Sequence, residues 1–129
     1  MTGRDPIRLG VAYSVVLPWD SGGVHTSEHF MPESFKAAGY QTAIMGKWHL
    51  GHSQQAFHPN NRGFDYFYGI TASLDIPPYF YIENNHITAQ KVDTIEAMNG
   101  KMFWRRGPIG NDFKHIEVLP KLTEVAVNY

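Results

Sequence analysis

Hydrophobic and polar positions form short segments along the chain, separated by glycine and proline. Pro32 and Glu33 suit the first turn of a helix, and Gly39 suits its C-terminal cap, which predicts a helix over residues 31–38. Residues 40–45 carry no charge and are rich in β-branched and aromatic side chains, which predicts a strand buried on both faces and ended by Gly46. A helix, a glycine turn, a buried strand and a polar loop are the order in which α/β proteins bring side chains to the carboxyl edge of a sheet.

The rest of the first half lacks a clear hydrophobic period. Residues 5–30 are predicted to be mostly loop, since prolines and a glycine-rich turn interrupt them. Residues 46–69 are rich in aromatic, histidine and glycine residues, which predicts an ordered loop with one helical turn over residues 64–67. Ordered loops of this length usually carry function.

The second half predicts a hairpin, a strand and a helix. Residues 79–82 and 86–89 flank Glu83-Asn84-Asn85, and asparagine tolerates the left-handed backbone of a tight turn. Residues 102–106 are predicted to form a short strand before a break at Gly107-Pro108. An amphipathic helix at the C-terminal end is predicted from the helical spacing of Leu119, Leu122, Val125 or Ala126, and Tyr129.

Length and composition favour a single α/β domain over residues 1–129. The chain has 129 residues, 43% of them hydrophobic, and a net charge of −1 with both signs scattered, so a polyanion or membrane-surface partner is not expected. No apolar run approaches the roughly 20 residues that span a bilayer. The chain has no cysteine, which excludes disulfides, thiolate metal sites and cysteine nucleophiles.

The segment with the clearest chemistry is the glycine-bounded loop at residues 46–51. Lys47 and His49 lie two residues apart, so in an extended loop their side chains share a face. An ammonium and an imidazole give several donors to one oxyanion, such as sulfate or phosphate, while Trp48 can shield the site and fix the loop. The alternative interpretation is a surface lysine and a packed histidine around a buried tryptophan.

Two other segments contain side chains that could bind a ligand. His49, His52 and His58 carry imidazoles of the kind that bind zinc, but their spacing is not diagnostic, and ordinary loop histidines are the stronger interpretation. Trp104-Arg105-Arg106 could stack on single-stranded nucleic acid. We expect instead that these arginines pair with acidic residues of the same domain.

Several segments together resemble the sulfatase family. Residues 39–51 match the second sulfatase signature, G-Y-x-T-x-x-x-G-K-W-H-L-G. Residues 2–10 resemble the T-G-R-x-P-x-R-x-G segment that arylsulfatases carry upstream, and residues 58–69 resemble the downstream H-P-x-x-x-G-F-D-x-F-x-G segment. Residues 73–78 and Glu83-Asn84 are similar to bacterial arylsulfatases.

The resemblance implies an alkaline-phosphatase-like fold, a mixed sheet with flanking helices, of which residues 1–129 would be one internal part. The family hydrolyses sulfate esters with a formylglycine nucleophile made in a C/S-x-P-S/A-R motif, and it binds calcium. Neither that motif nor the family's calcium ligands is found here, so we expect the isolated chain to be inactive. The family also implies a periplasmic, extracellular or lysosomal location.

Site roles are likewise implied only at matching positions. Lys47 resembles the family lysine that contacts the sulfate and the formylglycine hydrate, and His49 resembles the histidine that orients the hydrate. Ser73 falls where some arylsulfatases place a sulfate-site serine. The alternatives are a related phosphonate monoester or phosphodiester hydrolase, and a non-catalytic binding module. We also expect self-association through uncovered sheet edges.

Overall fold

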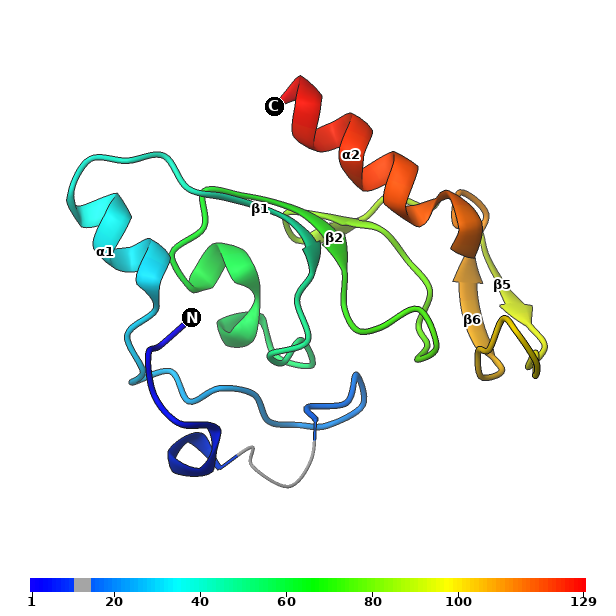
Figure 1. Ribbon diagram of the computed structural model, residues 1–129, viewed down its shortest axis with the longest axis horizontal. Coiled ribbons are helices and arrows are strands. Elements are labelled where there is room, and N and C mark those ends of the chain that lie inside the picture. The colour runs from blue at the N-terminus through cyan, green and yellow to red at the C-terminus, as the bar shows by residue number, and fades with distance from the viewer. Residues whose placement is uncertain (11–14) are drawn as a thin grey trace.

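The computed structural model describes residues 1–10 and 15–129, which form two sheets and two α-helices (Figure 1). Single 3-10 turns lie at Pro6–Leu9, Gln55–Phe57, Pro59–Asn61 and His115–Glu117. The larger sheet has the strand order β1-β2-β3-β4, and the smaller sheet pairs β5 with β6. The elements are α1 (Met31–Ala37), β1 (Ala43–Lys47), β2 (Tyr66–Ile70), β3 (Ile82–Glu83), β4 (His86–Ile87), β5 (Val92–Ile95), β6 (Gly107–Gly110) and α2 (Val118–Asn128).

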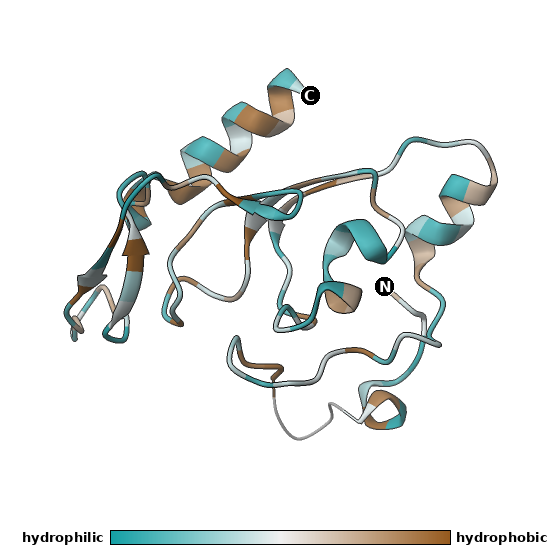
Figure 2. Cartoon of the chain, turned by 180° about the vertical axis from the view of Figure 1, so that it is seen from behind, coloured by the Kyte–Doolittle hydropathy of each residue, from teal (hydrophilic) through white to brown (hydrophobic). Residues whose placement is uncertain are grey.

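The larger sheet is mixed, as predicted for an α/β architecture. β1 pairs with β2 in parallel, whereas β2 with β3 and β3 with β4 are antiparallel. α1 lies at one end of the chain's arrangement, and α2 with the β5–β6 hairpin lies at the other (Figures 1 and 2). No helix in the described part of the chain is long and apolar enough to span a bilayer.

The predicted helix before the signature loop is confirmed. α1 begins at Met31 with Pro32 in its first turn, where the missing proline N–H leaves no bond unmade. The Glu33 carboxylate accepts a hydrogen bond from the Phe30 N–H, so two groups at the helix start satisfy each other. Gly39 follows with φ +88°, the left-handed conformation expected of a C-terminal glycine cap.

The strand after α1 was predicted three residues too early and too deeply buried. β1 begins at Ala43 and runs through Gly46 to Lys47, while Tyr40 is 63% exposed. β1 is an edge strand whose first four residues are half-buried and whose last residue, Lys47, is exposed, whereas the last four residues of β2 are buried. The expectation that uncovered edges promote self-association stays a prediction.

A close contact between two glycines fixes the pairing of β1 with β2. Gly46 and Gly69 are partners in the parallel ladder. A Cβ atom on Gly69 would lie 1.8 Å from the Gly46 carbonyl oxygen, so no larger residue fits there. Gly46 itself has φ +141°, which favours glycine, and it continues the strand that it was predicted to end.

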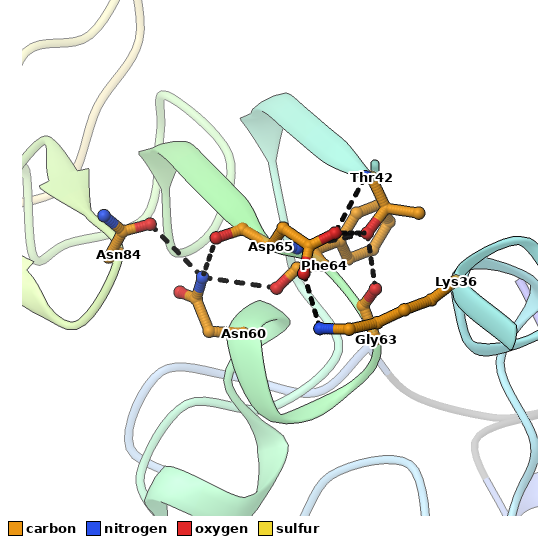
Figure 3. A network of polar contacts seen from close by, with 7 residues as sticks. All are labelled: Lys36, Thr42, Asn60, Gly63, Phe64, Asp65 and Asn84. Carbon is orange, nitrogen blue, oxygen red and sulfur yellow. Dashed lines mark hydrogen bonds and ion pairs between the residues drawn. The ribbon is translucent and has the colours of Figure 1, made fainter. Parts of the chain in front are cut away.

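Thr42 and Asp65 hold the beginnings of these two strands together (Figure 3). The Thr42 hydroxyl lies 2.6 Å from the Gly63 carbonyl oxygen and accepts a hydrogen bond from the Asp65 N–H at 3.1 Å. The Asp65 carboxylate accepts from the Thr42 N–H at 3.0 Å and forms an ion pair with Lys36. The Lys36 hydrogen bond, together with those from Thr42, lowers the pKa of Asp65. The helical turn predicted over residues 64–67 is not found, and this network explains why.

The hairpin and the C-terminal helix are confirmed in position. β3 and β4 pair around Asn84, whose φ is +54°, and the Asn84 side-chain oxygen accepts a hydrogen bond from the Phe67 N–H. In α2, Leu122 and Val125 pack against the sheet, whereas Leu119 is 73% exposed and does not belong to the buried face. Figure 2 shows hydrophobic and hydrophilic residues on different sides of this helix.

The strand predicted over residues 102–106 is wrong in position. The strand is β6, which contains the Gly107-Pro108 pair that was expected to break it, and residues 102–106 contribute only a bridge between Trp104 and Met98. Pro108 is tolerated because the sheet has two strands, and its carbonyl accepts a hydrogen bond from the Tyr79 N–H at 2.9 Å.

Two hydrophobic clusters lie against the larger sheet. The first, against α2, contains buried Tyr68, Ile70, Tyr79, Tyr81, Trp104, Phe113 and Val118. The second, toward the N-terminal loop, contains Val24, Phe30, Trp48, Phe64 and Phe67. Arg62 is 3% exposed beside the second cluster, where its guanidinium lies 4.2 Å from the Phe30 ring and donates to the Glu28 carbonyl. Phe67 belongs to the second cluster and its neighbour Tyr68 to the first, so consecutive strand residues face different clusters.

We predict that Thr42→Val destabilises the chain by about 1–3 kcal/mol, because a buried hydroxyl is lost and the Gly63 carbonyl loses its donor. Thr123→Val is the matched control, since Thr123 is exposed on α2 and should change stability by less than about 0.5 kcal/mol. Urea unfolding followed by circular dichroism measures both. Equal effects of the two substitutions would show that the network does not stabilise the strand pairing.

Candidate functional site

The loop at residues 46–51 leaves the carboxyl end of β1 and remains bonded to the chain beyond β2. Lys47 is the last residue of β1 and is paired with Ile70. The Trp48 N–H donates to the Ile70 carbonyl at 3.0 Å, and the His49 N–H donates to the Thr71 carbonyl at 2.9 Å. Two parallel strands therefore deliver Lys47, His49 and the residues after Ile70 to the same edge of the sheet.

Trp48 anchors this loop in the second hydrophobic cluster. Its side chain is 5% exposed and meets the Phe64 ring edge-on at 6.1 Å between centroids. Its indole N–H lies 2.9 Å from the carbonyl oxygens of both Gly51 and Phe57. The predicted role of Trp48 in fixing the loop is thus supported by its packing and its hydrogen bonds.

His49 has an unusual backbone and a buried, unpartnered ring nitrogen. Its φ is +56°, so the loop is not extended at His49, in contrast to the extended loop considered from the sequence. No described residue forms a hydrogen bond with the buried Nε2 atom of His49. Burial, and next the Lys47 ammonium, lower the pKa of His49, while the Asp75 carboxylate opposes them. A neutral His49 therefore keeps one ring nitrogen available to a polar partner.

Lys47 and Ser73 meet at one open pocket of about 490 Å³. Asp75 lines the same pocket, and interaction with the Ser73 side chain is one of the causes that lower its pKa. Lys47 and Asp75 both act on the charge of His49, so these four side chains form one electrostatic group. Of the three residues predicted from the sequence, Lys47 and Ser73 share the pocket, and His49 lies within electrostatic range of it.

The opposite wall of this pocket is apolar. Leu74 follows Ser73, and Phe103 reaches the pocket from the segment before β6. α2 contributes Val118, Leu119 and Leu122. The pocket thus joins a cationic rim to a hydrophobic surface, which suits an anionic group attached to a less polar one.

Asp75 and Arg105 are site residues that the sequence analysis missed. The Arg105 guanidinium lies 2.5 Å from the Asp75 carboxylate, and it also donates to the Asp75 backbone carbonyl at 3.1 Å. Partial burial raises the pKa of Asp75, but hydrogen bonds from Arg105 and Ser73 outweigh it and lower the pKa overall. The closeness of Asp75 to Ser73 in the sequence could have identified Asp75 as a site residue, but nothing in this segment identifies its arginine partner.

The histidine metal site considered from the sequence gains no support. His58 bonds through Nε2 to the His52 carbonyl at 2.8 Å, and its Nδ1 lies 3.3 Å from the Asn85 side-chain oxygen. Over residues 1–10 and 15–129, no three His, Cys, Asp or Glu side chains are grouped as metal ligands. These residues do not by themselves fit a calcium site, so no step of the chemistry is assigned to calcium here.

Trp104-Arg105-Arg106 does not form an exposed stacking patch. Trp104 is 8% exposed, donates its indole N–H to the Glu96 carbonyl at 3.0 Å, and stacks on His115 with 4.2 Å between ring centroids. Arg105 pairs with Asp75, and Arg106 pairs with Glu96 at 2.9 Å. The expectation that both arginines pair with acidic residues of the same domain is confirmed.

Comparison with known proteins gives matches in sequence and in fold. The model of the Sulfatase family matches residues 1–105. Arylsulfatase G from Mus musculus is 43% identical over 76 residues, which cover 59% of this chain and 14% of that protein. N-acetylgalactosamine-6-sulfatase from Mus musculus is 47% identical over 76 residues, which cover 54% of this chain and 14% of that protein. The chain thus matches about a seventh of the length of these relatives.

Two solved structures are similar in fold. A Bacteroides thetaiotaomicron protein described with the metabolism of multiple glycosaminoglycans superposes with a TM-score of 0.73 at 21% identity. The match covers 98% of this chain and 35% of that one, and it shows the fold alone. The crystal structure of Ps i-CgsB gives a TM-score of 0.52 at 37% identity, over 57% of this chain and 16% of that one. The expected mixed sheet with flanking helices is confirmed.

We predict that the chain loses stability as the pH falls from about 7.5 to about 5. Burial is the main cause that lowers the pKa of His49, His52 and His115 below the ordinary value of 6.5. In this window the unfolded chain binds protons that the folded chain does not, so the stability is full above pH 6.5 and falls below it. The carboxylates of Asp65 and Asp75 have lowered pKa values and stay ionised throughout.

Thermal melting across this pH range measures the effect. His49→Gln should reduce the loss of Tm on acidification, because one imidazole no longer resists protonation in the folded chain. His86→Gln, at an exposed position in β4, is the control and should leave the pH dependence unchanged. A Tm that is constant or rises toward pH 5 would contradict the burial of these imidazoles.

Proposed function

Because the chain belongs to the sulfatase family, we propose that it forms one wall of a sulfate-ester hydrolase site, as part of a single catalytic domain to which residues 1–129 contribute. The observation that carries the proposal is the pocket that Lys47 and Ser73 line, beside a half-buried His49 whose buried Nε2 atom has no hydrogen-bond partner among the described residues. The parallel pair β1 and β2 delivers Lys47 and the segment that carries Ser73 to the same edge of the sheet. The substrate in this proposal is a sulfate ester.

Lys47 is proposed to bind the sulfate group and to stabilise the transition state. Its side chain extends from the end of β1 into an open pocket, where an ammonium can approach a sulfate oxygen. When the S–O bond breaks, negative charge grows on oxygen, and a fixed cation at that place lowers the barrier. The pairing of Lys47 with Ile70 holds the backbone of the cation at the sheet edge.

His49 is proposed to hydrogen-bond the nucleophile and keep it oriented. In the complete family site, a formylglycine hydrate supplies the attacking oxygen, and this chain contains no such group. The side chain of His49 has the properties needed for the task, since burial and Lys47 favour its neutral form and its Nε2 atom is free of partners among the described residues. A neutral imidazole can donate or accept one hydrogen bond at that atom.

Ser73 is proposed as a second sulfate contact. It lines the pocket that Lys47 lines, and its hydroxyl oxygen retains lone pairs and a rotatable proton. Interaction with this side chain contributes to the lowered pKa of Asp75, so contact of the hydroxyl with a sulfate oxygen competes with that interaction.

We predict that the 129-residue chain binds inorganic sulfate weakly and does not turn over an aryl sulfate, because it contributes anion donors but no nucleophile. Lys47→Ala should weaken sulfate binding measured by NMR titration. The control is Lys91→Ala, which removes an exposed lysine next to β5 and should leave binding unchanged. Turnover by the purified chain would overturn the nucleophile argument, and a Lys47→Ala chain that binds sulfate normally would overturn the role of Lys47.

In a longer protein that includes the family's nucleophile motif, Lys47→Ala should lower kcat by about 10²-fold or more, as loss of an oxyanion donor does elsewhere. A chromogenic aryl sulfate assay measures it. An unchanged kcat would return the lysine to a structural role. Binding without turnover in that longer protein would instead favour a non-catalytic module.

A further inference from the structure

The pocket proposed to bind an anion contains a carboxylate. Asp75 lines it together with Lys47 and Ser73, and its charge reaches His49. An ionised carboxylate repels a sulfate group and partly cancels the attraction of Lys47. A cation paired with Asp75 offsets this repulsion.

Arg105 is placed to neutralise this carboxylate. Its Nη1 atom lies 2.5 Å from Oδ2 of Asp75 and 3.1 Å from the Asp75 carbonyl oxygen. The Arg105 backbone N–H donates to the same carbonyl at 3.2 Å. One arginine therefore binds both the side chain and the backbone of Asp75, which sets the direction of the carboxylate as well as its charge.

Arg105 is itself held by the first hydrophobic cluster. The Tyr79 hydroxyl donates to the Arg105 carbonyl at 2.8 Å, and Tyr79 is 1% exposed. The neighbouring Trp104 is buried and stacked on His115. The arginine backbone thus has a fixed position against the loop at residues 73–75, while its side chain, which is 50% exposed, is held by its two bonds to Asp75.

We propose that Arg105 is a positioning residue of the anion site, which neutralises Asp75 and holds its carboxylate, so that the pocket around Lys47 stays attractive to sulfate. The inference rests on the proposed function of this pocket. It assigns to Arg105 no contact with the sulfate itself. Arg105 affects sulfate binding only through Asp75, so substitutions of the two residues should have linked effects on the affinity for sulfate.

The test is NMR titration of the 129-residue chain with inorganic sulfate at low salt. Arg105→Ala should raise the Kd for sulfate about tenfold, because an unpaired carboxylate then faces the anion. Asp75→Asn should bind sulfate at least as well as the unsubstituted chain, and adding it to Arg105→Ala should restore binding. Arg105→Lys should retain most of the affinity, since it keeps the charge.

Arg106→Ala is the matched control, because Arg106 is the adjacent arginine, pairs with Glu96 and does not line the pocket. It should leave the Kd unchanged. The defect of Arg105→Ala should also shrink as sodium chloride is added, since salt screens the carboxylate. A purely structural role for Arg105 would give a defect that neither salt nor Asp75→Asn relieves.

Failure of this inference can be told apart from failure of the proposed function. If Lys47→Ala leaves the Kd for sulfate unchanged, or the unsubstituted chain shows no sulfate-dependent shifts around the pocket, the proposed function fails, and this inference with it. If Lys47→Ala weakens binding but Arg105→Ala does not, the inference alone is wrong. Weaker sulfate binding by Asp75→Asn would also overturn it, even if Arg105→Ala does not fold.

Discussion

The contact between Gly46 and Gly69 is the constraint on which the rest of the site depends. The two backbones approach so closely that a Cβ on Gly69 would lie 1.8 Å from the Gly46 carbonyl oxygen. This register pairs Lys47 with Ile70 and brings His49 to Thr71, and Ser73 follows two residues later at the same edge of the sheet. Because side chains alternate along a strand, a slip of one residue would turn Lys47 away from the pocket and Trp48 away from its cluster.

Charge within the site is balanced over a short stretch of surface. Lys47 provides the positive charge, burial and that charge keep His49 neutral, and Arg105 compensates Asp75. Lys47 forms no direct ion pair with any described residue, so its charge is not neutralised in that way. The carboxylate of Asp75 is paired with Arg105 and not with the lysine.

The sequence predicted the elements whose signals are local. The capped helix α1, the hairpin around Asn84 and the amphipathic α2 follow from neighbouring residues, and all three are found. Errors occurred where distant residues decide. Thr42 was read as part of a strand but bonds to Asp65, and Pro108 was read as a break although β5 pairs with its segment.

The candidate site divides along the same line. The loop that carries Lys47 and His49 is continuous in sequence, so a motif could identify it, and the same is true of the position of Ser73. Their roles stay predictions. The Asp75–Arg105 pair joins residues 30 apart in the chain, and several other arginines and acids were equally plausible partners before the fold was known. Only the packing of Tyr79 and Trp104 selects this pair.

Trp48 explains why packing and chemistry share one short motif. Ile44 and Trp48 face the second cluster, while Met45 and Ile70 pack with the first and Lys47 opens into the pocket beside it. The alternation of a strand thus buries the indole on one side and presents the ammonium on the other. The indole N–H then fixes the return of the loop by bonding the carbonyls of Gly51 and Phe57. Since the loop that carries His49 is held from its buried side, the imidazole keeps its place without any hydrogen bond from Nε2 to a described residue.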